Sequence, residues 1–164
     1  MQLLGQGRHE FGEEAKLSGQ PILKRAANAL FADVTLSKAA KSYSTWGTWG
    51  ILNSVISSSA ARNGGLWVGG DVSLYQDRLA FQPNGLNVAL QDGDMTADIP
   101  LSNVSVVKFR PAFITGIVEL ELTTNGASHF SFRCSDAKGV SQMIISTIRS
   151  LSDANRKAEE SQPR

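Results

Sequence analysis

Two glutamates on one predicted strand are the side chains in this sequence best suited to acid–base chemistry. Glu119 and Glu121 alternate with large apolar residues within the segment 116–123. Side chains two residues apart on a strand share a face, which would place the two carboxylates roughly 6–7 Å apart. Carboxylates at that separation can act as an acid–base pair. Both glutamates nevertheless only fill the polar half of an alternating strand, so we interpret them as surface residues without a catalytic role.

The remaining reactive side chains are few. His9 lies near the N-terminus and His129 on the polar face of a predicted strand, so we expect no zinc site. Cys134 is the single cysteine, which excludes a disulfide within the chain, and its apolar neighbours on the strand predict a buried, unreactive thiol.

Glycine pairs at 64–65 and 69–70 are followed by no Gly-Lys-Ser/Thr sequence. Their spacing therefore does not fit a nucleotide-binding phosphate loop, and we attribute the glycines to backbone turning. No Ser/His/Asp grouping has a recognisable context either. We predict a protein that is not an enzyme and uses no cofactor and no metal.

Composition limits the partners and the location. The formal net charge of the 164 residues is +1, which gives no global field that would favour nucleic acid. The first twenty residues lack the apolar run of a secretory signal, and no stretch reaches the roughly 18 apolar residues of a spanning helix. We expect a soluble cytoplasmic protein whose membrane contact, where there is any, is peripheral.

These residues would be positioned by the segment 66–134. Apolar and polar side chains alternate along it, which is typical of antiparallel sheet. If Gln76-Asp77 forms a two-residue turn, Leu74 faces Leu79 and Val72 faces Phe81 on the same side of a hairpin. Turn length and strand parity agree, so we predict this register.

A second hairpin is predicted around Asn125-Gly126. A two-residue turn there would put the two apolar faces on opposite sides, whereas a three-residue connection restores agreement. His129 then faces Glu121, or, with the register moved by two residues, Arg133 faces Glu119. Further strands are expected at 95–101, with Pro100 at an edge or a strand end, and at 104–109, while 83–85 and 91–94 are predicted turns.

A helix is predicted from Asp136 to about Leu151, with Ser135 or Asp136 as its cap. Its apolar residues recur every three or four positions and form one stripe that should dock on the sheet: Val140, Met143, Ile144, Ile148 and Leu151. Residues 1–20 and 152–164 are polar and are predicted to be flexible tails.

The segment from Gly69-Gly70 through Arg78-Leu79-Ala80-Phe81 resembles the second and third strands of GRAM domains, which belong to the pleckstrin-homology (PH) superfamily. Residues 22–31 resemble the first strand of that family, and Ile99-Pro100-Leu101 its next strand-to-strand step. The resemblance implies a mainly β fold in which about seven antiparallel strands form a PH-like barrel capped by one C-terminal α-helix. It also implies a binding module for membrane lipids or proteins rather than an enzyme.

Residues 32–65 depart from that family pattern as an insertion after the first strand, within a domain predicted over 21–151. Leu36, Ala39, Ala40 and Tyr43 follow helical spacing, so we predict a helical insertion. Trp side chains favour membrane–water boundaries, but apolar faces are more often simply buried, so the apolar centre of the insertion could instead pack on the barrel or on a second copy, or, least expected, around a small ligand. The predicted membrane or partner contacts are Trp46, Trp49, Ile51, Leu52, Val55 and Ile56.

Basic residues near the first strand and in the insertion are candidates for an anionic headgroup: Lys24, Arg25, Lys38, Lys41 and Arg62. Adjacent residues on a strand face opposite ways, so only one of Lys24 and Arg25 can face such a site. We therefore predict a module that docks on membrane lipid headgroups or on a partner protein. The alternative is a self-assembling interaction domain, a homo-oligomer that uses the insertion as its interface and binds no lipid.

Overall fold

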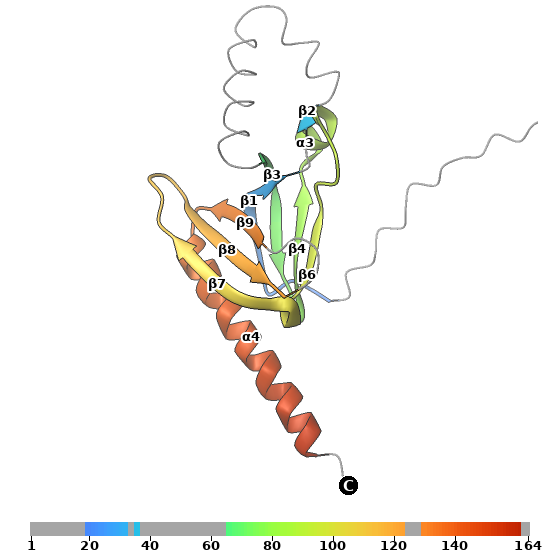
Figure 1. Cartoon of the computed structure of the whole chain (residues 1–164), viewed down its shortest axis with the longest axis vertical. Helices are drawn as coiled ribbons and strands as arrows, with labels where there is room; N and C mark the ends of the chain where they lie inside the picture. Colours follow the sequence, from blue (N-terminus) through green and yellow to red (C-terminus); the bar gives the residue numbers. More distant parts are fainter. Residues whose placement is uncertain (1–18, 33–34, 37–64, 124–128, 162–164) are drawn as a thin grey trace, which may run out of the picture.

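The computed structural model describes residues 19–32, 35–36, 65–123 and 129–161. Most of the chain in these ranges is extended, and one long helix follows the last strand (Figure 1). The elements are β1 (Leu23–Phe31), β2 (Thr35–Leu36), β3 (Leu66–Leu74), β4 (Arg78–Pro83), α3 (Gly85–Leu90), β5 (Gln91–Asp92), β6 (Ala97–Pro100), the 3-10 turn η1 (Leu101–Asn103), β7 (Val104–Arg110), β8 (Gly116–Leu122), β9 (His129–Cys134) and α4 (Ala137–Glu160).

Seven of the strands form one antiparallel sheet in the order β6-β4-β3-β1-β9-β8-β7. Strand β1 pairs with β3 over its whole length, but with β9 only at Asn28 and Ala29. Strand β9 thus pairs with only a short part of β1, and the sheet curls into a half-barrel (Figure 1). Together with the C-terminal helix this is the PH-like architecture that the sequence predicted.

The alternation of apolar residues explains why the sheet closes around one core. Buried side chains come from the same face of every long strand, and α4 adds Val140 and Ile144 to them. Each such side chain contributes about 1.5–3 kcal/mol when it is fully buried. The largest fully buried residues are Phe81, Phe132, Leu74, Leu79, Leu101, Leu120, Ile144, Val68, Val72, Val118 and Val140.

The predicted β3–β4 register is confirmed, and of the two registers left open for β8–β9 the structure has the one that pairs Glu121 with His129. Leu74 faces Leu79 and Val72 faces Phe81 across β3 and β4. His129 faces Glu121 across β8 and β9, although the connecting residues 124–128 lie outside the described part of the chain. Strand β6 is one of the two edges of the sheet and ends at Pro100, as expected for a residue that cannot donate to a ladder.

The helix α4 begins as predicted and ends later. The Asp136 carboxylate accepts a hydrogen bond from the Gly139 amide at the N-terminus. The predicted end near Leu151 is wrong, because the helix continues to Glu160 and projects beyond the sheet (Figure 1). The added turns carry no apolar stripe, but an ion pair between Arg156 and Asp153 supports them locally.

Two further expectations are corrected. A short helix, α3, follows Pro83 where only a turn was predicted, and the Asn84 side chain caps it by accepting a hydrogen bond from the Asn87 amide. Leu36, which the spacing placed in a helix, lies in β2 and pairs with Gln91 of β5. Apart from residues 32, 35, 36 and 65, the insertion lies outside the described residues, so its predicted helices stay a prediction.

No helix in the described part of the chain combines the length and the apolar character that crossing a membrane requires.

Candidate functional site

Most residues predicted to make contacts lie outside the described ranges. These are Trp46, Trp49, Ile51, Leu52, Val55 and Ile56 together with the basic residues Lys38, Lys41 and Arg62. Of the predicted site, the structure places only Lys24 and Arg25, both on β1.

Lys24 and Arg25 face opposite ways, as strand geometry requires. The Lys24 ammonium lies 3.1 Å from the Asp71 carboxylate on the outer face of the sheet. Arg25 shares the parity of the buried residues Ala27 and Ala29 but is itself exposed. The structure therefore does not bring the two cations together into one anion site.

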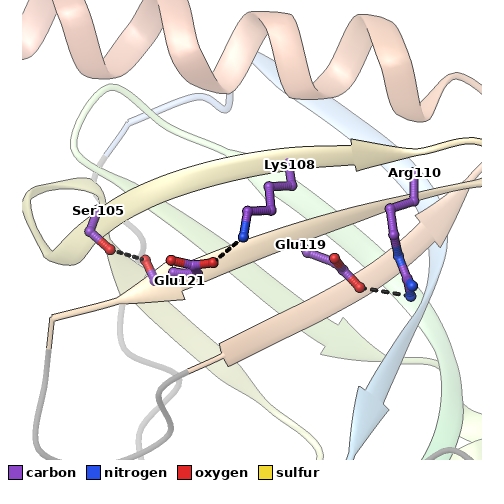
Figure 2. A network of polar contacts seen from close by, with 5 residues as sticks. All are labelled: Ser105, Lys108, Arg110, Glu119 and Glu121. Carbon is purple, nitrogen blue, oxygen red and sulfur yellow. Dashed lines mark hydrogen bonds and ion pairs between the residues drawn. The ribbon is translucent and has the colours of Figure 1, made fainter.

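The outer face of β7 and β8 carries a ladder of ion pairs on the side of the sheet away from α4 (Figure 2). The Arg110 guanidinium lies 2.8 Å from a Glu119 carboxylate oxygen, and Lys108 pairs with Glu121. The hydrogen bond from Lys108 lowers the pKa of Glu121, and the same bond raises the pKa of Lys108. Both carboxylates thus serve as partners of cations, in agreement with their interpretation as surface residues.

The loop between β7 and β8 presents apolar side chains to water. Phe113 is 103% exposed and Ile114 is 87% exposed, while Phe109 at the end of β7 is 38% exposed. The base of the loop is closely packed, since a Cβ built on Gly116 would lie 2.5 Å from the Phe109 ring and 2.8 Å from Ala137. Phe113 and Ile114 therefore lie near the middle of the connection 111–115, its apex, while its base is held by the sheet and the helix. The connection itself can be followed between β7 and β8 in Figure 1.

Sequence reasoning missed this apex. The signal was present, because Phe113 and Ile114 lie between two alternating strands and neither belongs to the apolar face of either strand. An apolar residue in a turn can also fold back onto the core, and only the structure shows that these two do not.

A second feature of the outer face joins β9 to β3 across β1. The Arg133 guanidinium stacks over the Trp67 ring, 3.6 Å from its centroid. Strand β1 lies between their two strands in the sheet, with Asn28 as the partner of Arg133. The Trp67 Nε1 and the Arg133 Nε are buried without a hydrogen-bond partner. Burial lowers the pKa of Arg133, and the contact acts as a cation–π clamp across three strands.

The pair Gly69-Gly70 lies inside β3, so its attribution to backbone turning is wrong. A Cβ on Gly70 would lie 2.1 Å from the Gln82 carbonyl oxygen of the neighbouring strand. At Gly69 a Cβ would meet the side-chain amides of Asn87, Asn28 and Asn84. The glycines are therefore explained by the close approach of the neighbouring strand and side chains, and not by a phosphate-binding role.

Cys134 and His129, the other reactive groups in the described part of the chain, form no site there. Cys134 is buried, and burial raises the pKa of its thiol, which disfavours the reactive thiolate. His129 is exposed opposite Glu121. Within the described ranges, no three His, Cys, Asp or Glu side chains are grouped so that they could hold a metal ion.

Comparisons with known proteins give a partial likeness among solved structures. The chain matches no family model and no curated protein. Among solved structures, it is similar to the Vps36 N-terminal PH domain, with 14% sequence identity and a TM-score of 0.40. The likeness covers 51% of this chain and 64% of that domain, which is less than two thirds of the domain. The PH-like architecture therefore rests on strand order, register and the terminal helix, and not on this likeness.

Proposed function

We propose that this chain is a non-catalytic, PH-like binding module that docks peripherally on a membrane through the apex of the β7–β8 loop. The exposure of Phe113 and Ile114 carries the proposal. Neighbouring large apolar side chains that stay in water mark interaction sites more often than scattered ones do. Because the loop base is already packed, both side chains can leave water without any change in the sheet.

The shape of the apex favours a bilayer over a protein partner. Side chains that protrude can enter the acyl boundary of a membrane without any preformed pocket, whereas a protein partner would need a matching cavity. Transfer of Phe113 and Ile114 would contribute about 3–6 kcal/mol in total. That corresponds to dissociation constants from roughly millimolar to tens of micromolar, which is weak, reversible docking.

The edges of the sheet are poor alternatives as docking sites. Strand β7 carries Lys108 and Arg110 and has a register shift between Val104 and Val106, and β6 is short and ends at Pro100. Charged side chains, bulges and proline are the features by which edge strands avoid pairing with other chains. We therefore place the contact at the loop and not at a strand edge.

Within the PH superfamily we propose the GRAM group, on the Gly69-Gly70 pair and the strand Arg78–Phe81. The insertion residues Trp46 and Trp49 and their apolar neighbours stay a predicted second contact. A second contact would strengthen docking, because a loop that contributes only a few kcal/mol gives marginal membrane residence by itself.

Co-sedimentation with phosphatidylcholine vesicles tests the proposal. Replacing both apex residues, Phe113→Ser with Ile114→Ser, should abolish measurable binding. The matched control replaces two exposed apolar residues elsewhere, Leu86→Ser with Val88→Ser on α3, which are 67% and 56% exposed. The control should bind like the wild type.

Equal binding by the apex variant and the wild type would refute docking through the loop. Light scattering covers the alternative function. If the wild type binds no vesicle and its mass rises with concentration, a self-assembling interaction domain replaces the membrane-docking module.

A further inference from the structure

Two ion pairs of the same kind lie at different distances from the β7–β8 loop. Arg110 is the last residue of β7, and its guanidinium is 2.8 Å from the Glu119 carboxylate. Lys108, two residues further from the loop, makes the equivalent pair with Glu121. Figure 2 shows both pairs on the same face. They differ mainly in distance from the apex, and this makes one a control for the other.

Depth in the membrane follows from strand geometry. The five loop residues 111–115 can carry the apex at most about 10 Å beyond Arg110, and two residues of β7 add about 7 Å. The interfacial layer on each side of the hydrocarbon core is roughly 5–8 Å thick. When Phe113 reaches the acyl boundary, the flexible Arg110 side chain can reach the headgroup phosphates, whereas Lys108 stays in water.

The Arg110–Glu119 pair is able to exchange partners. Its side chains are 62% and 28% exposed, and ion pairs between solvent-exposed side chains are weak. A guanidinium binds a phosphate through two parallel hydrogen bonds, which are stronger than those of a solvated pair. Docking at an anionic surface would also bring the Glu119 carboxylate close to negative headgroups, where repulsion weakens its hold on Arg110.

We infer that Arg110 exchanges Glu119 for the phosphate of an anionic lipid headgroup when the loop docks, so that this module prefers anionic membranes to neutral ones. The inference rests on the proposed docking through Phe113 and Ile114. It assigns Arg110 as the headgroup contact and Glu119 as the internal competitor that holds Arg110 in the free protein.

Vesicle titrations at one fixed salt concentration test the exchange. The probes are vesicles of phosphatidylcholine alone and of phosphatidylcholine mixed with phosphatidylglycerol. The variants are Arg110→Gln and Glu119→Gln, with Lys108→Gln and Glu121→Gln as controls that make the same charge changes further from the loop. Thermal melting of each variant confirms that it is folded.

Opposite effects are expected from the two partners of one pair. Arg110→Gln should lower affinity for the mixed vesicles about fivefold, since a cation near an anionic surface is worth about a factor of five. Glu119→Gln should raise that affinity by about three- to fivefold. The control pair should change it about twofold or less, because the surface field decays over roughly 8–10 Å. Affinity for phosphatidylcholine alone should stay unchanged in all four.

Three results would overturn the inference. If Arg110→Gln and Lys108→Gln lose equal affinity for the mixed vesicles, only the net charge of the protein matters. If the affinity of Glu119→Gln is unchanged or lower, Glu119 does not compete with the lipid for Arg110. Full displacement from mixed vesicles by inorganic phosphate at equal concentration would assign the site to free anions. By contrast, retention of neutral-vesicle binding by the Phe113→Ser and Ile114→Ser variant refutes the docking proposal itself, whatever Arg110 does.

Discussion

The two hairpins β3–β4 and β7–β8 belong to one sheet, but the side chains in their connections differ in whether they contact the rest of the fold. In the β3–β4 turn, the Tyr75 amide donates to the Arg78 carbonyl at 2.8 Å, and Arg78 lies over the buried Tyr75 ring. The Asp77 carbonyl accepts a hydrogen bond from Leu101. The two largest side chains of this turn, Tyr75 and Arg78, therefore contact each other within the fold.

The β7–β8 connection shows the opposite. Its base is fixed by contacts of Gly116 with Phe109 and Ala137, yet Phe113 and Ile114 at its apex are left in water. The fold gains nothing from two apolar residues that it does not bury. The comparison teaches where to look for function in a small sheet: the apolar residues that the fold leaves unused are those available for a partner.

The largest expected effect comes from giving the β7–β8 hairpin a short turn like that of the β3–β4 hairpin. Replacing residues 111–116 with Asn-Gly would join Arg110 to Ile117, which already face each other, by a two-residue turn. Vesicle affinity should fall more than about 100-fold, because about 3–6 kcal/mol of apolar transfer is removed.

The same replacement should change the free energy of unfolding by less than about 1 kcal/mol. A shorter loop saves roughly 1 kcal/mol of closure entropy, which offsets the lost pairing of Gly116 with Cys134. Urea denaturation measures the stability of the variant. A folded variant that still binds vesicles like the wild type would mean that the two connections do not differ in function.

The sequence predicted well whatever depends on strand parity. The partners Leu74 and Leu79, or Glu121 and His129, follow from counting residues around a turn, because side chains alternate strictly. The start of α4 followed from a local signal, the capping carboxylate of Asp136. Its end did not, since polar turns that lack an apolar stripe carry no periodic signal.

Features that depend on contacts between distant segments were out of reach. The clamp of Arg133 on Trp67 requires knowing that β9, β1 and β3 are neighbours, and the same holds for the close approach at Gly70. The candidate apex at Phe113 was missed for a related reason, because exposure of a turn residue depends on what else packs there. The predicted contacts in the insertion lie outside the described residues and stay predictions.

An intermediate effect should come from the tightly packed hairpin. A Cβ at Gly70 would lie 2.1 Å from the backbone oxygen of Gln82, whereas at Gly69 it would meet side-chain amides, the nearest at 3.0 Å. Side-chain amides can move aside, but a paired backbone cannot. Gly70→Ala should therefore lower the free energy of unfolding by about 2–3 kcal/mol, and Gly69→Ala by less than about 1 kcal/mol.

Urea denaturation of the two alanine variants measures this difference. At temperatures where both are folded, their vesicle affinities should equal that of the wild type, since β3–β4 is remote from the proposed contact. Equal stability of the two variants would contradict the close approach at Gly70. Lost vesicle binding in folded Gly70→Ala would show that the β3–β4 hairpin has a binding role of its own.

The smallest expected effect is a loss of stability in acid, and it arises from the ion pair of Lys108 with Glu121 on the paired strands β7 and β8. The hydrogen bond from Lys108 holds the pKa of Glu121 below its ordinary value of 4.5. The unfolded chain therefore binds a proton at Glu121 more readily than the folded chain does, so this contribution to stability is present above pH 4.5 and is lost as the pH falls through the folded pKa. The Glu121→Gln variant lacks the contribution at every pH.

The melting temperature measured against pH should show this as a difference between wild type and Glu121→Gln that is present at neutral pH and disappears in acid. Glu160→Gln, at the exposed end of α4, is the matched control and should follow the wild type throughout. Parallel curves for wild type and Glu121→Gln would mean that the pair with Lys108 adds nothing to the hairpin. Because this pair lies further from the apex than Arg110, removing it should alter the stem without removing the apolar contact that the loop offers.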